Sequence, residues 1–400
     1  MATNNNNKAL NVSHLRFPEF TGEWKEHSLS EYLEFKNGLN PDAKRIGKGI
    51  PFLSVMDILA DGVINYDNIR GKVEATEKEI ESFGVNSGDL LFQRSSETLE
   101  DVGRANVYMD NRTAVYGGFV IRGRKIGSYD PFFVKYLLAT PLARKRTCRM
   151  GAGAQHFNIG QESLAKISLY FPSMEEQQKI AEFLSLLDER IATQNKIIKK
   201  LETLIKAIGN KLLFGDEQNI RLGNILIERV EKSTTNNQYE VLSSTVKGIF
   251  SQRDYFSKDI ASENNTGYKI LRRGDIVLSP QNLWMGNINH NDKFDIGIVS
   301  PSYKIFTISE EFDCHYIAFL LKTRKALYGY MSVSEQGASV VRRNLNLEAF
   351  YELTYKIPHI AEQRRIGQIL SKLKDKIESE QTYLEMLRAQ KQYLLSNLFI

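Results

Sequence analysis

The chain is poor in cysteine and in long apolar segments. Its only two cysteines among 400 residues, Cys148 and Cys314, lie in different halves and form no C-x-x-C pair. This usage fits a reducing cytoplasm, where we expect the protein, and offers no cysteine-based metal site. No run of 18 or more apolar residues is present, so no membrane-spanning helix is predicted. The opening MATNNNNKALN lacks the apolar core of a signal peptide, and we expect residues 1–13 to form a flexible tail.

Signatures of catalysis are also scarce. The sequence has no G-x-x-x-x-G-K-[ST] phosphate loop, and no glycine-rich turn follows a strand and opens a helix. Its six histidines show no metal-ligand spacing, and acidic residues such as Asp42 and Asp57 have no partner His or Lys at a diagnostic spacing. We therefore predict a chain that is not an enzyme by itself and that binds neither a metal nor a cofactor.

An excess of charge of one sign is missing as well. The formal net charge is +5, and residues 14–171 carry 21 basic and 20 acidic side chains, while residues 215–356 carry 17 of each. If these segments bind an acidic polymer, they must do so through local clusters and not through bulk charge.

What the sequence does contain is an internal repeat. Two long helices are predicted, over residues 172–214 and 358–400, and a constant shift of 186 residues aligns Pro172 with Pro358. Apolar residues in both recur in alternating steps of four and three, the heptad seam of a coiled coil, with Gln194 and Glu380 at the same interruption. The simplest partner for each seam is the other one. The aligned seam residues are Ile180, Leu184, Leu187, Ile191, Leu201 and Leu212 in the first helix, and Ile366, Leu370, Leu373, Ile377, Leu387 and Leu398 in the second.

The start of the first helix has its own signal. Ser173 and Glu176 match the S-x-x-E capping box, in which each side chain satisfies a free backbone N–H. His359 stands at the cap position of the second helix and predicts a weaker start.

The segments before the helices repeat with the same shift. Gly88-Asp89 aligns with Gly274-Asp275, and Gly151-Ala152 aligns with Gly337-Ala338. The predicted organisation is therefore a domain over residues 14–171, a helix over 172–214, a similar domain over 215–357 and a helix over 358–400.

Each repeated domain has the pattern of an α+β fold. Short runs rich in Val, Ile, Phe and Tyr, bounded by Gly, Asn, Asp and Pro, predict strands and turns. We expect these strands at 50–55, 89–92, 114–121, 239–242, 275–278 and 296–306. One helix is predicted in each domain, at 132–138 and 315–321, and the remainder is expected to be loop.

Polar, basic and aromatic residues follow the Gly-Asp strands and form nearby clusters. Arginine suits the guanine edge, glutamine and asparagine suit adenine, and hydroxyl groups hold phosphate. For any one cluster, an ordinary solvated surface is as good an explanation, but the recurrence in both repeats favours DNA binding. The candidate DNA-binding residues are Arg94, Ser95, Ser96, Arg104, Arg122, Arg124, Lys125, Arg146, Arg149, Arg272, Arg273, Ser279, Gln281, Asn282, Trp284, Arg342 and Arg343.

Four stretches, FPEFTGEWKEHSLSEY, SGDLLFQRS, RGDIVLSPQ and PSMEEQQKIAEFLSLLDERI, resemble the specificity subunit of type I restriction–modification enzymes. The resemblance runs from about Leu15 to Ile400. It implies two target-recognition domains that each read one half of a split DNA site, joined by two antiparallel spacer helices. It also implies two methyltransferase subunits and two restriction (translocase) subunits as partners, which would use S-adenosylmethionine, ATP and Mg²⁺.

Two other interpretations stay open at this point. The chain could be a nuclease or transferase whose motifs are too degenerate to see, in which case it would itself bind S-adenosylmethionine or ATP. It could also be a coiled-coil scaffold that has no role with nucleic acid. A geometric argument favours the first hypothesis, because two similar readers dock equivalently on duplex DNA only if a twofold axis relates them, as antiparallel helices allow.

Overall fold

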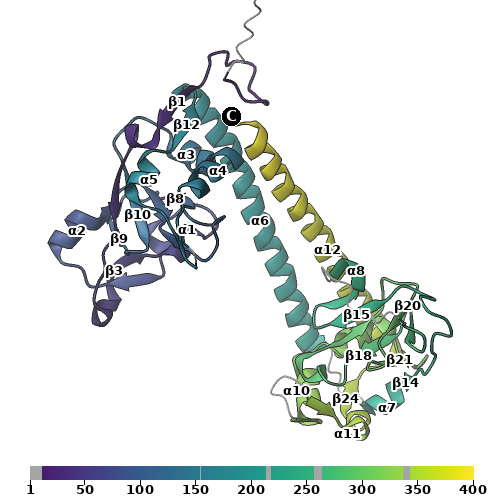
Figure 1. Ribbon diagram of the computed structural model, residues 1–400. Coiled ribbons are helices and arrows are strands. Elements are labelled where there is room, and N and C mark those ends of the chain that lie inside the picture. Colours follow the sequence, from purple (N-terminus) through teal and green to yellow (C-terminus); the bar gives the residue numbers. More distant parts are fainter. Residues whose placement is uncertain (1–10, 154, 213–217, 256–263, 337–342) are drawn as a thin grey trace, which may run out of the picture. The chain divides into compact units, whose positions relative to one another are not determined.

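The computed structural model describes residues 11–153, 155–212, 218–255, 264–336 and 343–400, without the side chains of 210–212 and 336. The chain divides into two compact units (Figure 1). Unit 1 consists of residues 1–195 and 383–400, and unit 2 consists of residues 196–382. Both long helices therefore have one part in each unit. No helix among the described residues is long and apolar enough to cross a membrane.

Unit 1 is built on two four-stranded sheets. The first sheet is antiparallel and has the order β2 (Leu33–Asn37), β10 (Val120–Lys125), β6 (Leu90–Gln93) and β8 (Ala105–Val107). The second has the order β4 (Gly71–Val73), β3 (Ile46–Leu53), β9 (Ala114–Tyr116) and β5 (Gly84–Val85). Two strand pairs complete it, β1 (Lys25–Ser28) with β12 (Ser168–Phe171) and β7 (Ser95–Ser96) with β11 (Phe157–Asn158). The helices before the first long one are α1 (Val55–Ile58), α2 (Glu77–Phe83), α3 (Pro131–Leu138), α4 (Pro141–Arg149) and α5 (Gln161–Ala165).

Unit 2 repeats the first of these sheets. Its antiparallel sheet has the order β14 (Leu226–Glu228), β21 (Lys304–Ile308), β18 (Ile276–Leu278) and β19 (Ile288–His290). Paired strands are β13 (Gln218–Arg221) with β24 (Thr354–Ile357), β15 (Leu242–Thr245) with β16 (Gly248–Ser251), β17 (Lys269–Arg272) with β20 (Ile296–Val299), and β22 (Ser334–Gln336) with β23 (Arg343–Leu345). Its short helices are α7 (Leu222–Ile225), α8 (Gln252–Tyr255), α9 (Cys314–Leu320), α10 (Arg324–Ser332) and α11 (Leu347–Tyr351).

The aligned Gly-Asp pairs have the same local structure in both units. Gly88 and Gly274 share a φ of +91°, a left-handed conformation that favours glycine. The aspartate that follows each glycine is buried and accepts a backbone hydrogen bond, from Asn86 to Asp89 and from Arg272 to Asp275. Burial raises the pKa of both carboxyl groups. The Gly-Asp pair is thus a turn that starts the central strand of the sheet.

The two predicted long helices are present as α6 (Met174–Leu212) and α12 (Ile360–Asn397). In unit 1 the first half of α6 shares a core with the last turns of α12, and in unit 2 the last turns of α6 pack against the core that contains the start of α12. The two helices therefore run antiparallel. Among the seam residues, Ile180, Leu184, Leu187, Ile366, Leu370, Leu387 and Leu398 are buried, and Ile191, Leu201, Leu373 and Ile377 are half-buried. The side chain of Leu212 lies outside the described part.

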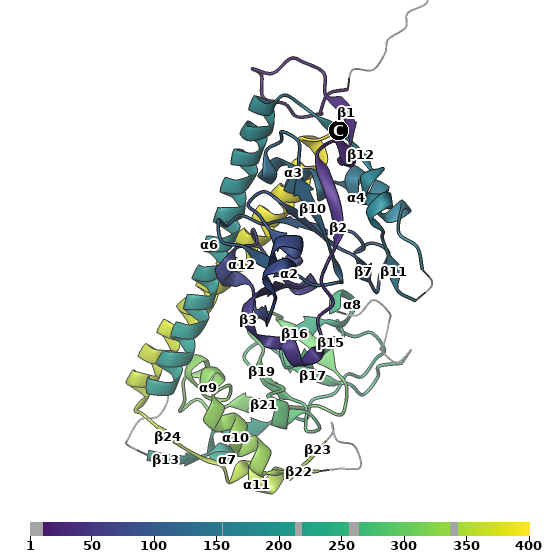
Figure 2. The same ribbon diagram turned by 90° about the vertical axis from the view of Figure 1, so that its left-hand side faces the viewer.

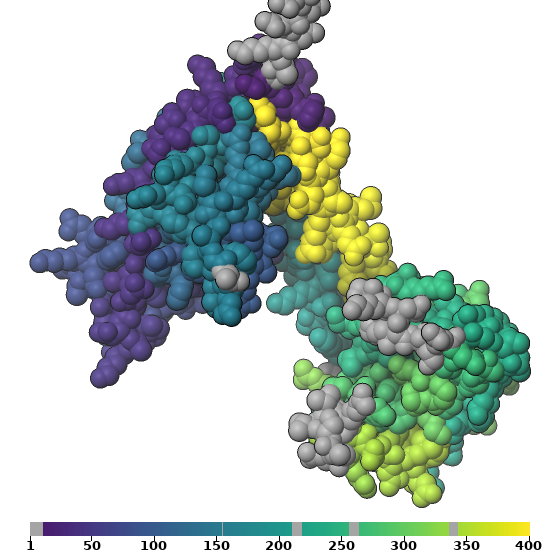
Figure 3. Space-filling view, in the orientation of Figure 1, coloured from purple at the N-terminus to yellow at the C-terminus, as the bar shows by residue number. Residues whose placement is uncertain are grey.

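The end of α12 completes the core of unit 1. The ring of Phe399 lies 6.2 Å from that of Trp24 and 5.4 Å from that of Phe133, centroid to centroid. The amide of Leu15 donates to the carbonyl of Asn397 at 2.8 Å. Figure 3 shows the end of the yellow helix beside the purple first residues of unit 1. The buried apolar surface of this domain therefore comes from both ends of the chain.

A glutamine side chain links each long helix to its domain by hydrogen bonds. Gln177 accepts from the amide of Asp130 at 3.1 Å and donates to the carbonyl of Pro172 at 3.1 Å. In unit 2, Gln363 makes the same two bonds, to Asp313 at 3.0 Å and to Pro358 at 2.9 Å. Both aspartates are the N-caps of short helices, α3 and α9. Gln177 and Gln363, which the 186-residue shift aligns, therefore have the same structural role.

We expect Gln177→Ala to lower the free energy of unfolding by about 2–4 kcal/mol, because it leaves a donor and an acceptor without a partner inside the protein. Chemical denaturation of the purified chain measures this. The neighbouring Gln178 is exposed and gives the matched control, Gln178→Ala, which should change stability by less than ~0.5 kcal/mol. Equal effects of the two substitutions would contradict the assigned role.

Three local predictions were wrong. Only half of the capping box exists: Ser173 accepts from the amide of Glu176 at 3.3 Å, but the Glu176 carboxylate instead accepts from Arg16 and from the indole of Trp24. The strands expected at 114–121 and 296–306 are each split in two by a turn. Helices α4 and α10 occupy segments that were expected to be loop, where Thr140 and Thr323 act as N-caps.

Candidate nucleic-acid interface

Several candidate residues of unit 1 gather where strand β6 ends and β10 begins. We call Asn40, Arg94, Ser95, Phe119 and Asn158 the loop edge of unit 1. The backbone places them together, because the amide of Arg94 donates to the carbonyl of Phe119 at 2.9 Å and the amide of Ile159 donates to the carbonyl of Arg94 at 3.0 Å. Pairing of β7 with β11 sets Ser95 opposite Asn158, and Figure 2 shows these strands side by side.

The side chains of this edge are available to different degrees. Arg94 is half-buried, and its guanidinium donates to the carbonyl of Gly118 at 3.2 Å, its one side-chain hydrogen bond within the described residues, which leaves other N–H groups for a ligand. The Ser95 hydroxyl donates to the amide oxygen of Asn158. Ser96 is buried and accepts from the amide of Thr98 at 3.2 Å, so it is engaged within the fold, and its contact with DNA stays a prediction. Arg104 is half exposed and pairs with Asp101 at 2.7 Å.

The basic cluster on strand β10 is mostly structural. Arg122 is buried, with 3% of its surface exposed, and its guanidinium donates to the carbonyl of Gly84 and lies over the ring of Tyr116. Burial lowers the pKa of Arg122. Arg124 donates to the same carbonyl at 2.9 Å. Arg122 is thus engaged within the fold, since its strand turns the side chain between the two sheets, and its contact with DNA stays a prediction. Lys125 is exposed at the other end of the strand and donates to the carbonyl of Tyr129 at 2.8 Å.

Helix α4 carries the second basic cluster of unit 1. Arg146 bonds to Glu26 at 2.6 Å and to the carbonyl of Ser168, so it joins α4 to the β1–β12 pair. Arg149, in the last turn of the helix, is exposed, and no partner for its side chain occurs in the described part of the chain. Arg149 therefore remains a candidate phosphate contact, whereas Arg146 is engaged within the fold.

Unit 2 has an equivalent loop edge, formed by Ser279, Gln281, Asn282, Trp284 and Arg343. Gln281 is exposed, and its carbonyl accepts from the amide of Arg343 at 3.2 Å. This bond corresponds to the pairing of β7 with β11 in unit 1. The guanidinium of Arg343 lies 4.6 Å from the centre of the Trp284 ring. Arg342 lies outside the described residues.

The loop that carries these residues is held by buried amides. The amide of Ser279 donates to the carbonyl of Asn287 at 3.0 Å, and Asn282 donates through its backbone to the carbonyl of Ser279 at 3.1 Å. The side chain of Asn287 is fixed in turn by Ser244 at 2.8 Å. The loop is therefore presented on a rigid base, as a site that reads bases requires.

Arg272 and Arg273 lie at the Gly-Asp turn of unit 2 and are paired with acidic groups. Arg272 bonds to Glu231 at 2.7 Å and Arg273 to Asp295 at 2.9 Å. Both side chains are partly exposed. They stand before strand β18, whereas the loop edge follows it, so the structure does not bring the two groups together.

Sequence reasoning missed Phe119 and Asn158 as candidates. The signal for Phe119 was the Gly117-Gly118 pair, which breaks the expected strand and turns the chain at the loop edge. The signal for Asn158 was its match with Asn344 across the repeat.

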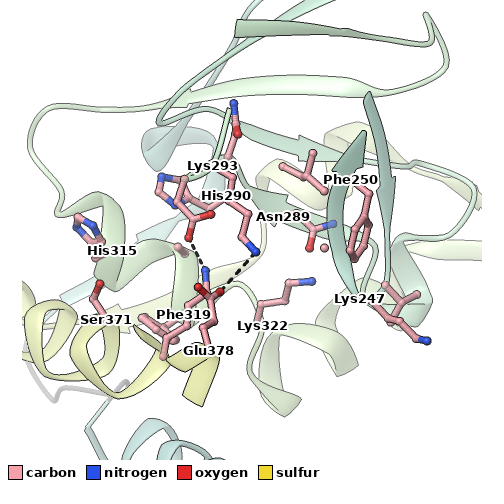
Figure 4. Close-up of a pocket in the computed structure, with 17 residues that line it drawn as sticks. Lys247, Phe250, Asn289, His290, Lys293, His315, Phe319, Lys322, Ser371 and Glu378 are labelled. Atoms are coloured by element: carbon pink, nitrogen blue, oxygen red, sulfur yellow. Dashed lines mark hydrogen bonds and ion pairs between the residues drawn. The ribbon is translucent and has the colours of Figure 1, made fainter. Parts of the chain in front are cut away.

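If the chain were an enzyme, a pocket of about 350 Å³ in unit 2 would be a candidate active site (Figure 4). It lies between hairpin β15–β16, α9 and α12. Both of its carboxylates are ion-paired, Asp292 with Lys374 and Glu378 with Lys293. Ser371 and His315 share the pocket, but no hydrogen bond joins them in the described structure. Burial lowers the pKa of His290 to about 4, so this imidazole is neutral at pH 7. The pocket therefore presents no nucleophile paired with a base.

Metal chemistry finds no support in the described ranges either. No group of three or more His, Cys, Asp or Glu side chains within them could hold a metal ion.

Two known proteins that the chain resembles in sequence are specificity subunits of type I restriction enzymes. The chain is 21% identical to the putative type I restriction enzyme MjaX specificity subunit of Methanocaldococcus jannaschii, over 97% of this chain and 96% of that protein. It is 25% identical over 207 residues to the type I restriction enzyme EcoKI specificity subunit of Escherichia coli, which is 48% of this chain and 43% of that protein.

Two solved structures share the fold. One is the S subunit of a type I restriction–modification system from M. genitalium, with a TM-score of 0.60 and 16% identity over 97% of this chain and 99% of that one. The other comes from work on complex assembly and conformational transition of the type I R-M system, with a TM-score of 0.52 and 14% identity over 93% and 96% of the two chains.

A family model matches most of the chain. The family described as "Type I restriction modification DNA specificity domain" matches residues 21–203 and 232–389, one segment in each repeat and most of the chain in total. The chain therefore belongs to the type I restriction–modification DNA specificity family.

Proposed function

We propose that this chain is the DNA-recognition subunit of a type I restriction–modification complex. Each unit reads one half of a bipartite, asymmetric site, and the long helices set the unread spacer between the halves. One observation carries the proposal: the two units share a sheet order and a Gly-Asp turn but present different side chains at equivalent loop edges. A repeated scaffold with different loop chemistry is what one protein needs to read two different half-sites.

The long helices also provide a surface for partners. In unit 1, large apolar side chains of α6 and α12 face solvent, among them Leu186, Met386 and Tyr393, which are 54–65% exposed. Leu186 also lines a hollow of about 610 Å³, together with Phe183, Leu187 and Tyr383, among others. Exposed apolar surface of this kind fits a helix from another subunit.

The partners that we propose are two methyltransferase subunits and two restriction (translocase) subunits. Adenine methylation with S-adenosylmethionine, and ATP- and Mg²⁺-dependent cleavage, belong to them, and this chain is not catalytic alone. What supports this division of labour is that both carboxylates in the pocket of unit 2 are ion-paired, Asp292 with Lys374 and Glu378 with Lys293.

The proposal is tested by mapping methylated adenines in DNA from cells that carry the chain with its partner subunits. The expected result is one split sequence with a fixed gap, and no methylation when this chain is left out. The purified chain alone should transfer no labelled methyl group from S-adenosylmethionine to DNA. Methyl transfer by the pure chain, or methylation without a bipartite pattern, would overturn the proposal.

We expect Arg94→Ala and Gln281→Ala each to affect one base pair more than the rest of the site. Losing a good bidentate contact costs about 1–3 kcal/mol at its own base pair, whereas losing a phosphate contact weakens all sequences alike. Binding of the assembled complex to a panel of single-base variants measures this. Arg149→Ala is the matched control, since an exposed arginine that contacts phosphate should weaken cognate and scrambled DNA equally. The same uniform loss for Arg94 or Gln281 would show that neither reads a base.

A further inference from the structure

We propose that Phe119 reads a thymine, by contact of its ring with the C5-methyl group, in the half-site recognised by unit 1. This inference rests on the proposed function and assigns a specificity-determining residue within the loop edge of unit 1.

Phe119 stands on a short turn that other segments hold in place. The amide of Val120 donates to the carbonyl of Gly117 at 2.9 Å and closes the turn between β9 and β10. Asn40 packs closely against the turn, because a Cβ at position 118 would lie 1.9 Å from its amide oxygen. Arg94 binds the turn twice, by its backbone amide to Phe119 and by its guanidinium to Gly118. The position of Phe119 is therefore fixed before any ligand arrives.

The side chain of Phe119 is exposed to solvent. Phe119 is 71% exposed, although its neighbours Tyr116 and Val120 are fully buried. A single exposed apolar residue is common and proves nothing by its exposure. The location of Phe119 indicates a role in recognition. Its ring lies at the same edge as Arg94, Ser95 and Asn158, all of which can bond to base edges.

The chemistry of the ring limits what it can recognise. A phenyl group forms no hydrogen bond with a base edge, so the only feature it can distinguish in the major groove is the thymine methyl group. A wedge between base steps is the other use of such a ring, but wedges belong to proteins that bend the minor groove. The polar neighbours of Phe119 suit major-groove hydrogen bonding, which favours the methyl contact.

Unit 2 provides an internal comparison. Its equivalent turn is closed by the bond from the amide of Tyr303 to the carbonyl of Ser300 at 3.1 Å, which places Ser302 where unit 1 has Phe119. Ser302 is exposed, and its hydroxyl lies 3.1 Å from that of Ser300. The aromatic contact at this turn is therefore expected for one half-site only.

The experiment uses the complete methylation complex and duplexes that carry its mapped site. Each thymine of the half-site read by unit 1 is replaced in turn by deoxyuridine, which removes the methyl group and keeps the base pair. For the unaltered complex, we expect one replacement to weaken binding about fourfold, the factor that corresponds to ~0.8 kcal/mol for one buried methyl group. For the Phe119→Ala complex, the same replacement should have no effect, and Phe119→Leu should retain part of the discrimination.

Controls separate this contact from a general loss of fold or of function. Ile126→Ala removes another exposed apolar side chain of unit 1, 60% exposed, beyond the far end of β10, and should leave the thymine effect unchanged. Equal deoxyuridine effects with and without Phe119 would overturn the proposal, as would a half-site that contains no thymine. A bipartite methylation pattern from the unaltered complex shows that the proposed function holds even where the thymine contact fails.

Discussion

Two residues inserted into both long helices, after Asn195 and after Thr382, are expected to abolish methylation of the bipartite site. These positions are where α6 and α12 pass from one unit to the other, so the packing inside each unit is kept. Two residues turn a helix by ~200° and lengthen it by about 3 Å. One reader would then be rotated away from the groove that the other still faces. We expect a loss of at least about 100-fold in methylation rate.

The control is an insertion of four residues at the same two positions. Four residues turn a helix by ~400°, close to a full turn, and lengthen it by about 6 Å. The heptad seam is nearly preserved by such a step. At ~3.4 Å per base pair, the unread gap should grow by one or at most two base pairs, with the same bases read on both sides. An unchanged gap with four residues, or full activity with two, would show that the helices do not measure the site.

A chain that ends at Asn397 is expected to lose the fold of unit 1 while keeping that of unit 2. Its missing residues include Leu398 and Phe399, which are buried in the core beside Trp24 and Phe133. Removing a buried leucine costs about 2–5 kcal/mol and a buried phenylalanine about 3–5. Together these losses approach the whole stability of a typical domain, roughly 5–15 kcal/mol.

Limited proteolysis measures the effect, because cleavage should appear within residues 11–171 and leave a resistant fragment from unit 2. Removal of Ile400 alone is the matched control and should change little, since this residue is only partly buried at the margin of the core. Resistance of unit 1 in the chain that ends at Asn397 would contradict the dependence on Phe399.

The regular parts of the fold could be predicted from the sequence because their signals are periodic or repeated. The heptad seam places both long helices within a few residues of their observed ends. The repeat of Gly88-Asp89 at Gly274-Asp275 identifies equivalent turns, whose backbone angles agree. Both signals depend on spacing along the chain, which a single sequence displays in full.

Other features could not be predicted because they depend on contacts between distant residues. Glu176 is 160 residues from Arg16, and that ion pair replaces the local cap that the S-x-x-E pattern indicated. Arg122 has the same charge as its exposed neighbour Lys125, and only the pairing of its strand decides that it is buried. For the candidate site, residue types pointed to the loops after the Gly-Asp strands, whereas the exposure of each side chain, Phe119 above all, required the structure.

Because residues 383–400 belong to unit 1, the two readers reach their folds in an unusual order during synthesis. Domains generally fold as they emerge, with the N-terminal one first, at about 5–20 residues per second. Here unit 2 is continuous in sequence and is complete while unit 1 still lacks Leu387, Leu394 and Phe399. Unit 1, most of which is synthesised first, therefore completes its fold after unit 2. A message that is interrupted shortly before its codon for Phe399 would yield a chain with one finished reader, unable to define a two-part site.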